Sequence, residues 1–323
     1  EKTAFLRQLG EYERGLIVIG PYAARDPLSF TRELGALARF LGWPVICDAL
    51  NPCREFASQF DCLITQHDCI LRNPRLADKL CPDAVLNLGP PPTSKILRAW
   101  LGQLDVPVWV LDQGEDNRDP LHRDAVHIRA SLKSFFADIR IEGGREPGHT
   151  TQWIEMEERA LDAIDTGLRR ESRLFEGKAA WMLSRELPKQ CHVVIANSMP
   201  VRDAEYFWRP GDNARIVHCN RGANGIDGTL STALGLAHAS VEPVVLLTGD
   251  LAFLHDSNGL LTAPEFRGSL TIVLLNNEGG DIFGNLPIAE YEPPFERFFT
   301  TPQGISLEKL ARSEERRVGK ECP

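Results

Sequence analysis

Short, uninterrupted apolar runs alternate with helix-like segments along most of this chain. The first half contains such runs at 15–20, 44–49, 83–89 and 106–112, and the second half at 191–198, 214–220, 242–250 and 270–277. Apolar runs of this length, bounded by turn-forming residues, indicate parallel strands that helices cover on both faces. The pattern therefore predicts an α/β fold with two doubly wound parallel-sheet (Rossmann-like) domains.

The length of 323 residues also favours two domains, because single hydrophobic cores rarely grow that large. Residues 140–152 are rich in Gly, Pro and polar side chains and resemble a linker, and a long helical stretch is expected at 153–187. We therefore predict a first domain at 1–145 and a second at 146–311 that is incomplete at its C-terminus. The nearly all-charged tail, 312–323, fits neither domain and is interpreted as foreign sequence or a truncation.

Composition excludes several classes of protein. The formal net charge of -9 argues against a nucleic-acid partner. No apolar run reaches the roughly 18 residues of a membrane-spanning helix, and no secretory signal is present, so we expect a cytoplasmic protein. The eight cysteines include no C-x-x-C pair, and we interpret them as reduced, mostly buried thiols rather than as a zinc cluster.

Two oxygen-bearing side chains follow consecutive predicted strands of the second domain. Asp250 comes directly after one apolar run and Asn277 after the next, with a helix-length insert between them. Ligands of parallel sheets bind at the carboxyl ends of strands, so both side chains are expected at one edge. A carboxylate and an amide oxygen suit a hard divalent cation, and Gly249, Gly279 and Gly280 would let a ligand approach the backbone. The arrangement predicts a Mg²⁺–diphosphate clamp.

Other interpretations of these residues remain open at this point. Asp250 could cap a helix and Asn277 could begin a turn, which are common roles for both residue types. Asp250 could also be the nucleophile of a Mg²⁺-dependent phosphatase, although the second acidic residue expected two positions on is Ala252. A dinucleotide site after the first strand is less favoured, because the sequence after Gly20 lacks the G-x-G-x-x-G spacing.

The Gly-Asp and Asn-Asn pair resembles the motif by which enzymes bind thiamine diphosphate (ThDP). That resemblance implies that Asp250, Asn277 and the Gly279 carbonyl bind Mg²⁺ or Mn²⁺. The segments at 197–203, 220–228, 279–287 and 295–304 further resemble the 2-succinyl-5-enolpyruvyl-6-hydroxy-3-cyclohexene-1-carboxylate (SEPHCHC) synthases of menaquinone and phylloquinone biosynthesis. The family reaction joins decarboxylated 2-oxoglutarate to isochorismate, and both substrates are polyanions.

The same resemblance implies roles for further residues. Arg202 and Arg221, with the Ser198 hydroxyl, are expected to bind substrate carboxylates, for which the guanidinium fork is well suited. Lys95 resembles a lysine that reaches the substrate from the first domain, and Ile226 the aliphatic side chain that bends the cofactor. The remaining expected contacts are Phe283 and Leu286 in the substrate pocket, and Gly249, Leu251, Ala252 and Ile282 against the cofactor.

One part of the family pattern is not recognised in this chain. In full-length relatives an N-terminal pyrimidine-binding domain supplies the glutamate that activates ThDP, and that domain faces a partner subunit. We therefore expect a fragment of a homodimer or homotetramer that is inactive by itself. The alternatives are another ThDP enzyme, such as an acetolactate synthase or a 2-oxo acid decarboxylase, and a non-catalytic module derived from one.

Overall fold

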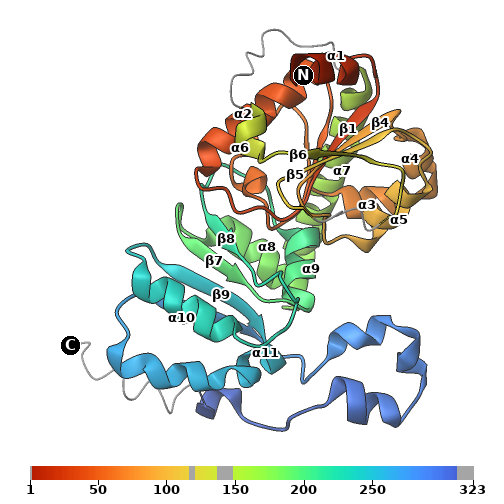
Figure 1. The fold of residues 1–323 in the computed structure, drawn as a ribbon. Helices are drawn as coiled ribbons and strands as arrows, with labels where there is room; N and C mark the ends of the chain where they lie inside the picture. Colours follow the sequence, from red (N-terminus) through yellow and green to blue (C-terminus); the bar gives the residue numbers. More distant parts are fainter. Residues whose placement is uncertain (1, 116–120, 137–147, 311–323) are drawn as a thin grey trace. The chain divides into compact units, whose positions relative to one another are not determined.

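The computed structural model describes residues 2–115, 121–136 and 148–310. The chain forms two compact units (Figure 1). The first unit comprises Glu1–Leu187 together with Ala204–Ala214, and the second comprises Pro188–Asp203 together with Arg215–Pro323. The domain bounds of 1–145 and 146–311 that we expected from the sequence stay a prediction. The charged tail at 312–323 lies outside the described residues.

The first unit is built on a six-stranded parallel sheet with the order β3-β2-β1-β4-β5-β6. The order reverses between β1 and β4, which confirms the doubly wound topology for this unit. Its strands are β1 (Gly15–Ile19), β2 (Val45–Cys47), β3 (Leu63–Ile64), β4 (Ala84–Leu88), β5 (Val108–Asp112) and β6 (Val126–Arg129).

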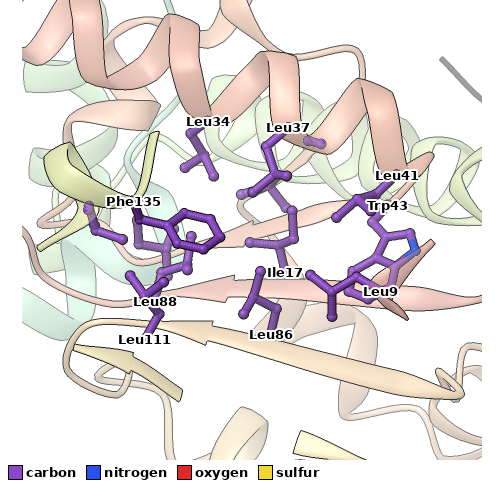
Figure 2. Close-up of a cluster of buried hydrophobic side chains, with 14 of the residues drawn as sticks. Leu9, Ile17, Leu34, Leu37, Leu41, Trp43, Leu86, Leu88, Leu111 and Phe135 are labelled. Atoms are coloured by element: carbon purple, nitrogen blue, oxygen red, sulfur yellow. The ribbon is translucent and has the colours of Figure 1, made fainter. Parts of the chain in front are cut away.

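Apolar side chains cover both faces of this sheet. Along β1, Ile17 and Ile19 belong to one cluster of buried side chains, whereas Leu16 and Val18 belong to another on the opposite face. Figure 2 shows the first cluster, in which leucines of two helices pack onto Ile17 and neighbouring strands. Helices α1 (Lys2–Leu9), α2 (Pro27–Leu41) and α6 (Leu132–Phe136) contribute to it. Helices α3 (His67–Leu71), α4 (Pro74–Lys79), α5 (Lys95–Gln103) and α7 (Gly148–Arg170) contribute to the second cluster.

Helix ends in this unit follow local sequence. Asp26 precedes α2 and its carboxylate accepts the Ser29 N–H at 3.1 Å, while Gly42 ends the helix with a φ of 68°. The long helical stretch expected at 153–187 is helical over most of its length and contains two helices, α7 and α8 (Glu176–Glu186). At the break, the Glu171 side chain accepts the Arg173 N–H at 2.8 Å, a local bond that competes with the helical hydrogen bond of that amide. The helix α7 also includes residues 148–152 of the expected linker.

A buried ionic network lies within the first unit. The Arg54 side chain is fully buried, and its guanidinium lies 3.2 Å from a Glu205 carboxylate oxygen. The other Glu205 oxygen lies 3.0 Å from His67 Nε2. Burial alone would raise the pKa of Glu205, but Arg54 and His67 hold it below its ordinary value. The guanidinium also donates to the backbone carbonyls of Cys47, Thr65, Glu205 and Trp208.

The second unit contains a four-stranded parallel sheet with the order β10-β9-β7-β8. Its order reverses between β7 and β9, so the predicted α/β class is confirmed here as well. Helix α10 packs on one face through Leu230, Ala233 and Ala237. The elements are β7 (His192–Ile195), β8 (Ile216–His218), α10 (Thr229–Ala239), β9 (Val244–Gly249), α11 (Asp250–His255), η3 (Ser257–Glu265) and β10 (Leu270–Leu275). Helix α9 (Met199–Phe207) begins in this unit, and its residues from Ala204 onward belong to the first unit. Within the described residues, none of the helices has both the length and the apolar content to cross a membrane.

Two histidines on neighbouring strands of the second unit form a hydrogen-bonded pair. His192 Nδ1 lies 2.9 Å from His218 Nε2, and both rings are partly buried. Burial and, to a smaller extent, the nearby His192 lower the pKa of His218 to about 4. Burial also lowers the pKa of His192. Both imidazoles therefore stay neutral in the folded protein at pH values where histidines of the unfolded chain already bind a proton.

The folded second unit should lose stability as the pH falls from about 6.5 toward 4. In that window the unfolded chain binds protons that the folded histidines exclude, so the free energy of unfolding falls by about 1–3 kcal/mol. Urea unfolding followed by circular dichroism at pH 7 and pH 5 measures this change. His218→Asn should flatten the dependence, whereas His255→Asn, at an exposed histidine of the same unit, should leave it unchanged. Equal slopes in all three proteins would contradict this account.

Candidate functional site

The loops that follow the strands of the second unit meet at the carboxyl edge of its parallel sheet. Asn197 and Ser198 follow β7, the turn at 219–228 follows β8, Asp250 follows β9 and the turn at 276–280 follows β10. This edge is where parallel sheets bind ligands. Apart from Gly249, which is the last residue of β9, the candidate residues predicted in the second half of the sequence lie in these loops or in or directly after the short helices that follow them.

Asp250 is the first residue of α11 and is 5% exposed. Its Oδ1 accepts the Leu251 N–H at 2.8 Å, and the carboxylate also accepts a backbone hydrogen bond from Gly279. Burial raises the pKa of Asp250, and the nearby Glu278 carboxylate raises it further. A carboxylate in this position carries an electrostatic cost that a bound cation would offset.

The turn after β10 reaches Asp250 because β9 and β10 are paired neighbours, with Gly249 opposite Leu275. Gly279 has a φ of +137°, a conformation that favours glycine. A Cβ at this position would lie 2.0 Å from the Thr300 carbonyl oxygen, and the adjacent Gly280 N–H donates to that oxygen at 2.7 Å. Only glycine fits this close approach, which keeps the Gly279 backbone within hydrogen-bonding distance of Asp250. The half-buried Asn277 lies two residues earlier in the same turn.

This donor set fits a hard divalent cation. Carboxylate, amide and carbonyl oxygens are the ligands that Mg²⁺ and Mn²⁺ take, and the raised pKa of buried Asp250 indicates a carboxylate that a cation would stabilise. Over the residues that the structure describes, no group of three or more His, Cys, Asp or Glu side chains could hold a metal. The cysteines in that part of the chain are free thiols.

The two predicted substrate arginines are both held by the turn after β7. Arg202 Nη1 donates to the Ser198 carbonyl at 2.6 Å, and Ser198 has a φ of 71°. Arg221 Nη1 donates to Asn197 Oδ1 at 2.8 Å. The structure thus brings Ser198, Arg202 and Arg221 together. Asn197, which sequence analysis did not single out as a site residue, connects them.

The predicted apolar contacts lie in two of the same loops. Ile226 is half-buried within the turn after β8. Ile282, Phe283 and Leu286 follow Gly280 in and after the short helix η4 (Asp281–Asn285). Phe283 is 37% exposed and Leu286 is 40% exposed, which suits residues that line an open pocket. The Phe283 ring packs edge to face on Phe299, with the ring centroids 5.6 Å apart.

Lys95 belongs to the first unit, where it begins α5 after the strand β4. Its side chain is exposed, and the preceding Ser94 caps the helix by accepting the Leu97 N–H at 3.1 Å. Its role toward a substrate stays a prediction, as do the roles assigned to Leu251 and Ala252 at the start of α11.

Comparison with known families matches both halves of the chain. Residues 4–195 match the family described as the middle domain of thiamine pyrophosphate enzymes. Residues 200–319 match the C-terminal TPP-binding domain of thiamine pyrophosphate enzymes, TPP being another abbreviation for ThDP. Among solved structures, the benzoylformate decarboxylase from Polynucleobacter necessarius superposes with a TM-score of 0.66 at 15% identity, over 97% of this chain and 57% of that one. At that identity, the likeness concerns the fold alone.

Curated relatives share much more of the sequence. The SEPHCHC synthase of Acaryochloris marina is 44% identical over 313 residues, which are 96% of this chain and 53% of that protein. The SEPHCHC synthase of Microcystis aeruginosa is 46% identical over 303 residues, which are 93% of this chain and 52% of that protein. The chain thus spans about half the length of these relatives. Together with the two domain matches, this similarity shows that the chain belongs to the thiamine pyrophosphate enzyme family.

Proposed function

We propose that the protein to which this chain belongs is a SEPHCHC synthase, a ThDP- and Mg²⁺-dependent transferase that joins decarboxylated 2-oxoglutarate to isochorismate in menaquinone biosynthesis. The relatives that carry this name, at 44% and 46% identity, support the proposal. The observation that carries it is the set of residues at the carboxyl edge of the second sheet. The buried Asp250 carboxylate follows one strand of this sheet, and Arg202 and Arg221 form hydrogen bonds with two consecutive residues that follow another strand.

The metal and the cofactor are assigned to residues that fit them chemically. Asp250, the Asn277 amide oxygen and the Gly279 carbonyl would hold Mg²⁺ or Mn²⁺, and the cation would hold the diphosphate of ThDP. When bound, ThDP supplies the electron sink that decarboxylation of a 2-oxo acid needs. Gly249, Leu251, Ala252 and Ile282 would border the cofactor, and Ile226 would pack beneath it.

The substrates are assigned to the arginine side of the edge. Arg202 and Arg221 would each pair with a carboxylate, since a guanidinium binds carboxylates through parallel hydrogen bonds. The Ser198 hydroxyl would add a donor, Lys95 a further cation, and Phe283 and Leu286 would exclude water from the pocket. A cytoplasmic homodimer or homotetramer that acts on these small molecules, and not on nucleic acid, completes the proposal for the whole protein.

A chimera tests this function. The matching half of the Acaryochloris marina synthase is replaced by this chain, and the chimera is given isochorismate, 2-oxoglutarate, Mg²⁺ and ThDP. Mass spectrometry should detect SEPHCHC, and the Arg221→Ala chimera should form it at least about 100-fold more slowly, because the lost interaction is a charge-assisted pair. Pyruvate in place of 2-oxoglutarate should give little product. A chimera that binds ThDP but prefers pyruvate would instead support another ThDP enzyme.

A further inference from the structure

Asn197 forms hydrogen bonds through both ends of its carboxamide. The residue is 1% exposed and lies two positions after Ile195, the buried last residue of β7. Its Nδ2 donates to the Asn220 carbonyl and to the Gly225 carbonyl, both at 2.7 Å. These two carbonyls lie on either side of residues 221–224, which include Arg221, and Gly225 directly precedes Ile226. One amide group therefore fixes both ends of this turn.

The other end of the carboxamide holds the side chains of the same turn. Asn197 Oδ1 accepts from Arg221 Nη1 at 2.8 Å and from the Cys219 thiol at 3.5 Å. A carboxamide has two N–H donors and one oxygen with two lone pairs, so these contacts use its full capacity. Buried polar groups that are fully satisfied in this way restrict a structure to one arrangement.

The next residue holds the second arginine. Ser198 adopts a left-handed backbone conformation, with a φ of 71°, and its carbonyl accepts from Arg202 Nη1 at 2.6 Å. Two adjacent residues of one turn therefore anchor two guanidiniums that come from different elements, α9 and the turn after β8. The spacing between the two cations is set by this turn.

We propose that Asn197 is a positioning residue that sets the orientation of Arg221 and the shape of the turn at 219–226. With Arg202 held by Ser198, the site is arranged for a ligand that carries two carboxylates. This inference rests on the proposed function and deepens it, because it assigns dicarboxylate selectivity to a side chain that acts through its neighbours. Aspartate has no donors for the two carbonyls, and alanine has no polar group at all, so neither can replace Asn197.

The reactivity of Cys219 tests the positioning directly. The chain is treated with iodoacetamide, and peptide mass spectrometry gives the alkylation rate of each cysteine. In Asn197→Ala, Cys219 should react about tenfold faster, since the hydrogen bonds that hold the turn are lost. Cys69, which is exposed in the first unit, should react at an unchanged rate, and Cys191, which is 0% exposed in the second unit, should stay protected. Asn258→Ala, at an exposed asparagine of the same unit, is the matched control.

A second variant keeps the test decisive if Asn197→Ala unfolds the unit and exposes Cys191. Asn197→Asp has the same size and keeps an oxygen for Arg221, but it places an acceptor against the Asn220 and Gly225 carbonyls. Cys219 should again react faster while Cys191 stays protected. A wild-type alkylation rate at Cys219 in Asn197→Asp would overturn the proposal.

Binding of 2-oxoglutarate tests the consequence for substrate. Calorimetry should find about tenfold weaker binding to Asn197→Ala and to Arg221→Ala than to the wild-type chain. The double variant should bind no more weakly than Arg221→Ala alone, because Asn197 acts through Arg221. Additive losses would overturn that mechanism. A wild-type chain that does not bind 2-oxoglutarate would contradict the proposed substrate, while the Cys219 rates would still decide whether Asn197 holds the turn.

Discussion

Replacing Asp250 with alanine should abolish measurable binding of Mg²⁺–ThDP to this chain. Asp250 is the one full negative charge in the proposed oxygen donor set, and loss of a metal ligand costs on the order of 100-fold or more in affinity. Isothermal titration of Mg²⁺–ThDP into the chain measures the loss. Because burial raises the pKa of Asp250, its carboxylate is costly without a cation. The unliganded variant should therefore be at least as stable as the wild type.

The matched control for this prediction is Glu242→Gln. Glu242 is an exposed acidic residue just before the amino end of β9, the strand that Asp250 follows at its carboxyl end. The control removes one negative charge from the same unit and should bind Mg²⁺–ThDP as the wild type does. Undiminished binding by Asp250→Ala would refute the metal assignment, and equal losses in both variants would point to a general effect of charge.

Replacing Arg54 with methionine should lower the free energy of unfolding of the first unit by about 3–5 kcal/mol. The substitution keeps an apolar chain of similar length but leaves the Glu205 carboxylate buried without its cation, and it removes donors from four carbonyls. Urea unfolding followed by tryptophan fluorescence measures this loss. All six tryptophans lie within the first unit, so the signal reports that unit.

Arg39→Met is the control for Arg54→Met. Arg39 also pairs with a carboxylate, that of Asp61 at 2.9 Å, but the two side chains are 48% and 64% exposed. Ion pairs in water contribute little, so this change should cost no more than about 1 kcal/mol. If both substitutions cost the same, the stability of the first unit would not depend on the buried network.

The strands that sequence predicted best are those with long apolar runs. Gly15–Ile19 and Val244–Gly249 are buried on both faces, so nearly every residue carries the signal of burial. The strands that were missed lack that signal. Leu63–Ile64 is only two residues long, and Val126–Arg129 is mostly exposed and half polar. Their places in the sheet follow from pairing with neighbours, which a local pattern does not contain.

The break within the helical stretch at 153–187 was not predicted, for a similar reason. Neither proline nor glycine occurs in residues 171–175, so the sequence offers no obvious stop between α7 and α8. Where the helix ends, the Glu171 carboxylate accepts hydrogen bonds from the Arg173 N–H and guanidinium. Such a contact depends on the rotamer of the Glu171 side chain, and the helix propensities of the residues give no indication of it.

The candidate site shows both the strength and the limit of a simple rule. A polar side chain at the end of an apolar run led to Asp250 and Asn277, whose strands the structure places side by side. The same rule applied to the apolar run before Asn197 would have singled out that residue too. Its partners were out of reach, however, because they lie 22 to 28 positions away and meet it only when β8 pairs with β7.

The first compact unit includes Ala204–Ala214 in addition to Glu1–Leu187, and this affects where the chain can be truncated. A truncated protein ending at Leu187 would keep Arg54 and Glu55 but discard their partners Glu205 and Trp208. It would leave the Arg54 guanidinium with the Cys47 and Thr65 carbonyls but without its carboxylate partner, and it should precipitate or be degraded. A truncated protein that keeps all residues of the first unit must extend to Ala214. It then also contains Pro188–Asp203, which belong to the second unit, so no single cut leaves both units complete.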